Sequence, residues 1–524
     1  VAALLLAMAA PPATAAPPAA AGAARPSCQN TSRLMCAEVE DYDAAFNGAY
    51  VGHDEPSLLF YSDRAGAGNA MQYQLTLPKD PPPVPVPGRS YNFMLRPTFW
   101  FGMALCDTQS YPEQVRTCTP DSDTNITPLA RHAGTAFMEL QFYPPGYVQQ
   151  FDGFSCDARS WCAALTIDSL SEDPVAGTVL NPACRNQILG GTEYVNFAYV
   201  TYNGRPQGPP NPLQFDAVAS GRPDPAKVLF MRQGDDVRVN IHDTAQGVRV
   251  QLDDLSTHRS GSMTASAGNG FGQIQYAPTS GCTMLPYDFH PMYATSSPAT
   301  RVPWAAHSYN VAFSDEIGHF DFCTKVDTAT GTCTGLEGPP GGQEPADADD
   351  TGCFTAAQST LVRVDGCLGS NAPGFDGTSY LKDWPDGNTR LHPTPVLFTS
   401  PRTGPGFRTD YARTAFETDT PRIEAPDQGG VCDRTTGTGC TIVPPTDDGP
   451  PAAFYPFFSS TGDRPGCRWL IGNDVPGLSR ADFGRQNQYG TLLPQTYLVF
   501  GGGGTTQVLL NDFHQNLPAN PCRA

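Results

Sequence analysis

The short segment SDEIGHFDFC, residues 314–323, gathers several side chains that could take part in chemistry. It contains Glu316, His319 and Asp321, two carboxyl groups with an imidazole between them. A pair of carboxyl groups can divide the roles of nucleophile and general acid, and an imidazole can exchange protons near neutral pH. These three residues therefore form the candidate catalytic group of the sequence.

Their arrangement depends on whether the segment is a regular strand. Strict alternation over residues 307–323 places His319 and Asp321 on one face and Glu316 on the other. A β-bulge at Gly318 would bring the two carboxyl groups to the same face, because glycine is a common bulge residue. Without a bulge, the same residues form the polar edge of a strand, with His319 hydrogen-bonded to Asp321. The sequence leaves both arrangements open.

The stretch Glu316-Ile317-Gly318-His319-Phe320-Asp321 resembles the bulged catalytic strand of laminarinase-type sandwich glycoside hydrolases. That strand carries two catalytic glutamates with an aspartate between them. Here Gly318 stands where the central aspartate would be, and the last acid is Asp321 instead of glutamate. The resemblance implies that Glu316 is nucleophile or acid and that Asp321 is its partner. We expect His319, which lies between them in the sequence, to tune their pKa values.

Histidines form a second candidate group. His290, His307 and His319 lie close together in a chain that has 9 histidines. Imidazole nitrogens are frequent ligands of zinc and copper, so these residues could form a metal-dependent active site. A straight strand from His307 to His319 would extend about 40 Å at about 3.3 Å per residue, so shared ligation requires a turn between them.

Two aromatic residues near this segment could contact a substrate. Trp304 and Tyr309 carry rings that could stack on sugars, although most aromatic residues of a sandwich lie in its core. The acidic stretches at residues 347–350 and 383–388 supply the oxygen ligands that Ca²⁺ prefers. A structural Ca²⁺ is therefore a candidate cofactor, and an ordinary acidic loop explains the same residues equally well.

The elements that would position these residues are β-strands, because long amphipathic helical patterns are nearly absent. The clearest unit is residues 235–255, in which apolar and polar residues alternate on both sides of a short turn with a glycine. This pattern predicts an antiparallel hairpin with one face on a core and one face in water. Its buried face would consist of Val237, Val239, Ile241, Val248, Val250 and Leu252.

Length and composition agree with an all-β protein. The chain has 524 residues, which is too long for a single hydrophobic core. Its 52 glycines and 52 prolines suit a fold with many turns. We therefore expect two β-sandwich or jelly-roll units rich in disulfides. The large domain would cover residues 40–334 and a smaller C-terminal β domain residues 351–524, with a Gly/Pro/acidic linker at residues 335–350 between them.

The first 24 residues and the cysteines point to export. Residues 1–24 read as a signal peptide followed by an Ala/Pro-rich leader, and no later stretch is long and apolar enough to span a membrane. Sixteen cysteines in an exported chain predict disulfides. The close pairs would be Cys28/Cys36, Cys106/Cys118, Cys156/Cys162, Cys323/Cys333, Cys353/Cys367 and Cys432/Cys440. The remaining Cys184, Cys282, Cys467 and Cys522 would pair over longer distances.

Several segments together resemble a large uncharacterised family of secreted, disulfide-rich, all-β proteins of bacteria and fungi. They are ELQFYPPG, WCAALTID, SGSMTAS, PYDFHPMY, WAAHSYNVAFSDEIGHF and AAFYPFF. The resemblance implies export and the fold class, and it carries over no catalytic residue.

The sequence therefore favours a secreted, carbohydrate-active protein with a polysaccharide or glycan as its partner, acting as a glycoside hydrolase. A net charge of −20 argues against nucleic acid, since a phosphate backbone would be repelled. Two alternatives remain: a non-catalytic glycan-binding or surface protein, and a metal-dependent enzyme built on the histidines. The sequence carries no signal for the oligomeric state.

Overall fold

The structure is a computed structural model. It describes residues 57–61, 70–79, 98–105, 136–143, 145, 156–157, 159–170, 172–173, 178–179, 181–185, 193–216, 220–275, 281–291, 304–309, 326–327, 332–333, 336–337, 344–345, 394, 396–421, 458–462, 466–471, 481–483, 488–499, 504–517 and 519–522. For some strand residues, among them 304–309, 415–421, 488–499 and 504–517, it describes the backbone and the strand register alone.

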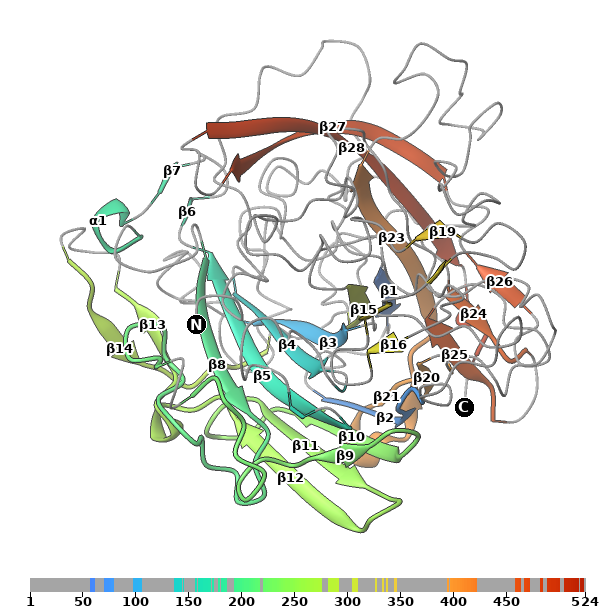
Figure 1. Cartoon of the computed structure of the whole chain (residues 1–524), viewed down its shortest axis with the longest axis horizontal. Helices are drawn as coiled ribbons and strands as arrows, with labels where there is room; N and C mark the ends of the chain where they lie inside the picture. The colour runs from blue at the N-terminus through green and yellow to red at the C-terminus, as the bar shows by residue number, and fades with distance from the viewer. Residues whose placement is uncertain are drawn as a thin grey trace.

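Antiparallel strands make up nearly all of the described regular structure, which confirms the predicted all-β class. Helical residues in the described ranges are few, and Figure 1 shows how little they add to the sheets. They are α1 (Pro182–Arg185) and the 3₁₀ turns Ala267–Asn269 and Pro405–Phe407.

Two ten-stranded sheets contain most of the strands. Sheet 1 has the order β27 (Gln488–Val499), β28 (Gly504–Leu517), β23 (Arg413–Pro421), β1 (Ser57–Tyr61), β15 (Trp304–Tyr309), β3 (Thr98–Leu105), β4 (Ala136–Tyr143), β5 (Ser160–Leu170) and β8 (Glu193–Tyr199), with β9 (Met231–Arg232) on β5. Sheet 2 has the order β12 (Arg259–Thr264), β11 (Arg249–Asp254), β10 (Asp236–His242), β2 (Ala70–Thr76), β20 (Leu397–Thr399), β25 (Arg468–Ile471), β24 (Phe458–Ser460) and β26 (Ala481–Phe483), with β21 (Arg402–Thr403) paired to β2 and β22 (Thr409–Asp410) paired to β21.

Four short two-stranded ladders complete the described strands. They are β6 (Glu172–Asp173) with β7 (Thr178–Val179), β13 (Gly272–Ile274) with β14 (Met284–Pro286), β16 (Val326–Asp327) with β17 (Thr332–Cys333), and β18 (Leu336–Glu337) with β19 (Glu344–Pro345).

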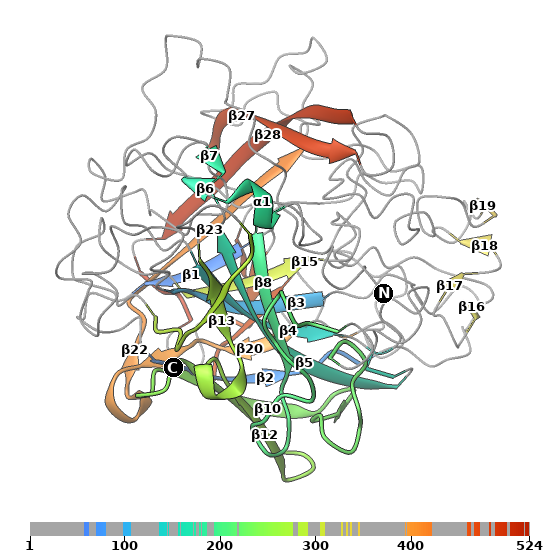
Figure 2. The same ribbon diagram turned by 90° about the vertical axis from the view of Figure 1, so that its left-hand side faces the viewer.

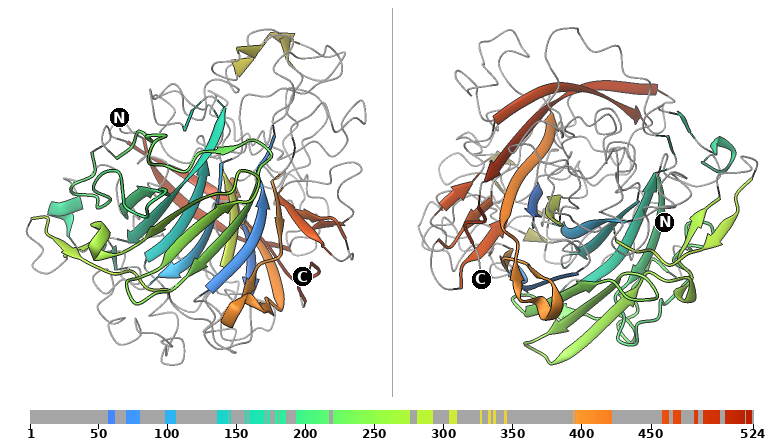
Figure 3. Two further views of the ribbon diagram at one scale, coloured as in Figure 1. Left: turned by 90° about the horizontal axis from the view of Figure 1, so that it is seen from below. Right: turned by 180° about the vertical axis from the view of Figure 1, so that it is seen from behind.

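The two sheets pack face to face around one apolar core, as in a β-sandwich. Figure 2 shows β2, β10 and β12 of sheet 2 as a layer below β1, β15 and β3 of sheet 1. Aromatic rings join the layers: Tyr73 and Phe101 have ring centroids 4.2 Å apart, and Phe60 lies 6.3 Å from Phe398. Sheet 1 also curves strongly, from β8 through β3 and β23 to β27 (Figures 1 and 3).

The predicted hairpin at residues 235–255 is present as β10 and β11, with Val239 opposite Leu252. All six residues of its predicted apolar face are fully buried in the core. Gly247 forms the turn with φ 100°, a conformation in which glycine has no Cβ to clash. A Cβ at this position would lie 2.5 Å from the carbonyl oxygen of Ala265, so the close approach also requires glycine.

Both sheets combine strands from the two predicted domains. In sheet 1, β23 and β28 from residues 351–524 pair with each other and β23 pairs with β1. In sheet 2, β20 pairs with β2 and β25 pairs with β20. The predicted boundary at residues 335–350 therefore does not coincide with a division between the sheets.

Three disulfides lie in the described part of the chain. The close pair Cys156–Cys162 is confirmed. Two of the cysteines left for long-range pairing form Cys184–Cys282, 98 residues apart, and the other two form Cys467–Cys522, 55 residues apart. The other predicted pairs, the signal peptide and the two acidic calcium candidates involve residues outside the described ranges. Within those ranges, the longest helix is far too short and polar to be a membrane-spanning segment.

Candidate functional site

The candidate catalytic group, Glu316, His319 and Asp321, lies outside the described residues, as does the bulge expected at Gly318. Its geometry therefore stays a prediction. The strand just before it, β15, is described by its backbone and lies in the middle of sheet 1.

β15 places the other predicted residues at defined register positions. His307 stands opposite Trp100 of β3 and Ser57 of β1. Trp304 stands opposite Met103, a core residue, so its register position is on the core side of the sheet. Tyr309 is two residues after His307 and thus shares its face, as the alternation predicts.

The face of sheet 1 that points away from sheet 2 is called the inner face here, because the sheet curves around it (Figure 3). On β3, Phe99 and Phe101 lie in the core, so Trp100 between them belongs to the inner face. Its side chain is fully buried. By register, His307 also belongs to the inner face.

Strand β4 adds a buried polar group to the inner face. Gln141 Nε2 donates a hydrogen bond of 2.6 Å to Glu139 Oε2, and the Tyr143 hydroxyl donates to Gln141 Oε1. Thr166 Oγ1 on β5 donates to the Glu139 carbonyl oxygen at 3.2 Å. All four side chains are buried. A buried carboxylate needs such partners, so this group fixes Glu139 in one position.

On the described strands, a set of four ionisable residues on the inner face lies toward the other end of sheet 1, on β23 and β28. Glu417 stands opposite His514, and Asp419 stands opposite Asp512. Phe416 of β23 stands opposite Leu58, a core residue, so its neighbour Glu417 belongs to the inner face. Because alternate residues share a face, all four positions lie together there. We call Glu417, Asp419, Asp512 and His514 the carboxyl block.

The spacing of these positions follows from sheet geometry. Directly opposite residues have Cβ atoms about 4.5–5.5 Å apart, and residues two apart on a strand are separated by about 7 Å. Like charges directly opposite each other destabilise a sheet, so the Asp419–Asp512 pair is a costly choice for a purely structural position. The carboxyl block therefore has the composition of an acid–base site, and its residues occupy adjacent register positions on one face of the sheet.

One cross-strand row connects this block to the middle of the sheet. From Glu417 the register passes through Ser57 of β1 and His307 of β15 to Trp100 of β3. Gln141 of β4 is the next residue in the row. The predicted residue His307 thus lies between the carboxyl block and a buried aromatic side chain, on the same face as both.

The metal hypothesis needed His290 and His307 to converge. Pro291, the neighbour of His290, bridges to Leu105 at one end of β3, whereas His307 pairs with Trp100 near the other end. The five residue steps from Trp100 to Leu105 correspond to about 17 Å of strand, too far for one ion with bonds of about 2 Å. Among the residues whose side chains are described, no group of three or more His, Cys, Asp or Glu could hold a metal ion.

His290 has a different partner. Its Nδ1 lies 2.8 Å from Asp243 Oδ1, and both side chains are largely buried. The hydrogen bond to Asp243 raises the pKa of His290, although burial opposes this, and the charges of Asp243 and Asp288 raise it further. This pair joins the segment after β14 to the end of β10, so its role in the described structure is to hold that segment in place.

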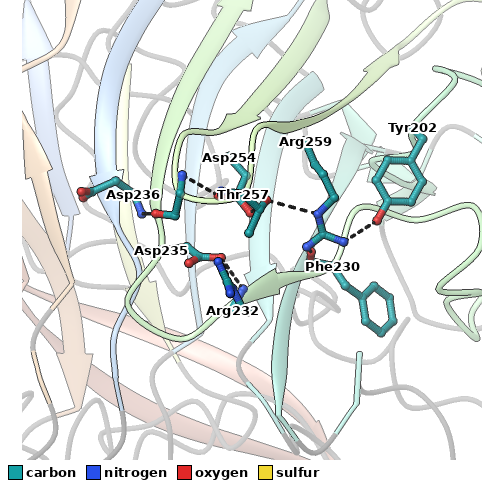
Figure 4. A network of polar contacts seen from close by, with 9 residues as sticks. Tyr202, Phe230, Arg232, Asp235, Asp236, Asp254, Thr257 and Arg259 are labelled. Carbon is teal, nitrogen blue, oxygen red and sulfur yellow. Dashed lines mark hydrogen bonds and ion pairs between the residues drawn. The ribbon is translucent and has the colours of Figure 1, made fainter.

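A second carboxyl pair, Asp235 and Asp254, lies between the turns that flank β10 and β11 (Figure 4). Asp254 Oδ1 accepts backbone hydrogen bonds from Ser256 and Thr257, and Asp235 Oδ2 accepts one from Arg232. Burial raises the pKa of Asp235, and the charge of Asp254 and a hydrogen bond to it act in the same direction. Since both carboxyl groups organise turns, this pair is a structural anchor.

The carboxyl block also has a signal in the sequence, although Glu316 and Asp321 were the predicted pair. The segments RTAFETDTP and NDFHQN alternate acids with apolar or uncharged residues, which marks a strand face. Neither segment reveals that the other is its neighbour, because they lie almost a hundred residues apart. Only the strand register brings Asp419 and Asp512 together.

Comparisons with known proteins add no relative: no family model, no curated protein and no solved structure matches this chain. The chemistry of the inner face is therefore inferred from its geometry alone.

Proposed function

We propose that this protein is a carbohydrate-active enzyme, a glycoside hydrolase whose catalytic carboxyl groups belong to the carboxyl block on the inner face of sheet 1. The observation that carries the proposal is the strand register that sets Asp419 opposite Asp512 and Glu417 opposite His514. Sandwich folds serve many functions, so the fold contributes little to the argument.

Glycoside hydrolysis needs two carboxyl groups on either side of the scissile bond. Enzymes that retain the anomeric configuration have them about 5–5.5 Å apart, close to the spacing of the directly opposite positions Asp419 and Asp512. In this assignment one carboxyl group attacks the anomeric carbon and the other protonates the leaving oxygen. Glu417, about 7 Å along the strand from Asp419, is the partner that an inverting mechanism would use instead.

Export belongs to the same proposal. The three described disulfides are typical of an oxidising compartment, as is expected of an enzyme that meets polysaccharides outside the cell.

The test compares carboxyl-to-amide variants on a panel of plant, fungal and bacterial polysaccharides. Asp419→Asn and Asp512→Asn should each lower the release of reducing ends by about 100-fold or more, the usual contribution of acid–base groups. Asp253→Asn on sheet 2 is the matched control, because Asp253 is partly exposed and bonded only to Gln251 in the described hydrogen bonds. Nuclear magnetic resonance of the first anomer formed should show retention.

Glu316→Gln belongs to the same series, because Glu316 and Asp321 remain the alternative catalytic pair predicted from sequence. Loss of activity in Glu316→Gln with full activity in Asp419→Asn and Asp512→Asn would move the site to residues 314–323. If the wild-type protein releases no sugar from any polysaccharide, hydrolysis is refuted.

A second candidate function is non-catalytic glycan binding, favoured by the outer face of sheet 2. Side-chain amides lie next to each other on neighbouring central strands of this sheet, where Gln72 Nε2 of β2 donates a hydrogen bond of 2.6 Å to Asn240 Oδ1 of β10. On the next strand the amide residue Gln251 stands opposite Asn240. These partly exposed groups match the donors and acceptors of sugar hydroxyls. Binding to a polysaccharide without release of sugar would favour this function.

A further inference from the structure

Tyr202 is the one large apolar side chain that is exposed among the described residues, with 38% of its surface accessible. Tyr202 lies shortly after β8 and is the residue after Thr201. Thr201 forms isolated β-bridges to Ser262 of β12 and to Val228. Tyr202 therefore stands where the edge of sheet 1 meets the edge of sheet 2. A single exposed aromatic residue needs no explanation by itself, so its surroundings decide the argument.

The ring of Tyr202 is held at both ends. Its backbone N–H donates a hydrogen bond of 2.8 Å to the carbonyl oxygen of Lys227. Its hydroxyl accepts a hydrogen bond of 3.1 Å from Arg259 Nη1. The ring face consequently stays exposed while its orientation is fixed.

Arg259 is itself held by two further bonds (Figure 4). Nη2 donates a hydrogen bond of 2.6 Å to the carbonyl oxygen of Phe230, and Nε donates one of 3.2 Å to Thr257 Oγ1. Thr257 in turn donates to the buried carboxylate of Asp254. The guanidinium group that positions Tyr202 thus cannot turn away without breaking three bonds, which makes the ring preorganised.

Polar groups surround the ring at the same edge. Asn203 and Arg205 are exposed beside Tyr202. Lys227 and Asp224 form an exposed ion pair of 3.5 Å. A pyranose ring offers an apolar C–H face ringed by hydroxyl groups, and a fixed aromatic face with donors and acceptors at its rim is its chemical complement.

This edge is remote from the carboxyl block. From β23 to β8 the order of sheet 1 takes six strand-to-strand steps, which correspond to about 29 Å along the curved sheet at about 4.8 Å per step. A ligand at Tyr202 would therefore contact a part of a long polymer different from the part at the carboxyl block, and a short oligosaccharide would not reach both.

We propose that Tyr202, positioned by Arg259, is the stacking residue of a secondary glycan-binding site that holds a polysaccharide chain at the edge of the sandwich. This inference rests on the proposed function, because it assumes that the protein acts on or binds carbohydrate.

The test measures binding and activity separately. Wild type, Tyr202→Ala, Tyr202→Phe and Arg408→Ala are sedimented with insoluble cellulose, chitin and β-1,3-glucan. The same proteins are assayed on whichever polysaccharide of the panel is degraded and on a short soluble oligosaccharide of the same linkage. Tyr202→Phe keeps the ring and loses the bond to Arg259. Arg408→Ala is the control, because it removes an exposed charge that is not part of the proposed site and should leave sedimentation unchanged. Equal thermal unfolding midpoints show that the variants are folded.

Tyr202→Ala should weaken sedimentation by about fivefold to tenfold, the effect of losing one aromatic contact, and should leave activity on the short oligosaccharide unchanged. Tyr202→Phe should fall between wild type and Tyr202→Ala, since the ring remains but turns more freely. If Tyr202→Ala binds and degrades the polymer as well as the wild type does, this inference alone is overturned. A wild-type protein that neither binds nor degrades any of the polysaccharides overturns the proposed function and this inference together.

Discussion

The substitution Asp235→Asn should stabilise the protein at neutral pH, although it removes a buried charged residue. Asp235 and Asp254 are 5% and 1% exposed, and a hydrogen bond joins their carboxyl groups. Two carboxylates cannot share a hydrogen bond without a proton. Asp254 accepts hydrogen bonds from two backbone amides and the Thr257 hydroxyl, and burial together with the charge of Asp254 disfavours a second negative charge on Asp235.

The direction of the pH dependence follows from the raised pKa of Asp235. The folded protein holds this proton more tightly than the unfolded chain, in which an aspartate has a pKa of about 3.9. The stabilisation is therefore complete below the unfolded pKa and is lost as pH rises through the folded pKa. Above the folded pKa the buried negative charge of Asp235 faces Asp254, and a poorly satisfied buried polar group costs about 1–3 kcal/mol, so the free energy of unfolding should fall by an amount of this order.

Asparagine at position 235 reproduces the protonated form at every pH. Its amide N–H₂ can donate to Asp254, and its carbonyl oxygen can still accept the 2.7 Å bond from the Arg232 backbone. Thermal or chemical unfolding at pH 4.5 and 8 should show a smaller decrease for Asp235→Asn than for wild type, with Asp253→Asn as the control. The reasoning is refuted if the variant keeps the wild-type pH dependence or is destabilised by several kcal/mol at pH 8.

Two other predictions concern contacts between distant segments. His290→Gln should lose about 1 kcal/mol of stability below pH 6 and much less at high pH. The bond to Asp243 raises the pKa of His290, and the stabilisation by this bond disappears as pH rises through that pKa. Unfolding measured at pH 5.5 and 9 checks this, and an equal loss of stability at both pH values contradicts it. Replacing Cys184 and Cys282 together by serine should lower the free energy of unfolding by about 2–4 kcal/mol, since their disulfide closes a long loop. An unchanged denaturant midpoint would show that the disulfide does not stabilise the folded protein relative to the unfolded chain.

Local patterns in the sequence were sufficient for the all-β class and for individual strands. The hairpin at residues 235–255 illustrates why: Val237 and Val250 alternate with polar neighbours, and a glycine marks the turn between them. Neighbouring strands joined by a short turn can pair in few ways, so pattern and turn together define the register.

Pairing between distant strands was not predictable in the same way. β1 lies between β15 and β23, which follow it in the chain by more than two hundred and three hundred residues. No local pattern distinguishes this neighbour from any other alternating strand, because the choice depends on how the apolar faces of all strands fill one core. For the same reason the prediction of two consecutive domains did not anticipate that β20 and β25 share sheet 2 with β2.

A site built on such distant pairing depends on the register of its last strand. A slip of one residue in β28 would move Asp512 and His514 from the inner face to the core face. Two kinds of contact hold the chain just after β28. Cys522 forms a disulfide with Cys467. Asn520 Nδ2 donates hydrogen bonds of 2.7 Å to Ser400 Oγ and 3.1 Å to the carbonyl oxygen of Tyr411.

These anchors explain how the carboxyl block can tolerate its own repulsion. Cys467 precedes β25 of sheet 2, so the disulfide ties the end of sheet 1 to the opposite layer of the sandwich. The backbone N–H of Asn520 also donates 2.7 Å to the carbonyl oxygen of Ala412, directly before β23. β23 and β28 are thereby joined at the end where Leu517 stands opposite Thr414, in the core-facing register. With the register fixed at that end, Asp419 and Asp512 are held opposite each other although like charges there disfavour pairing.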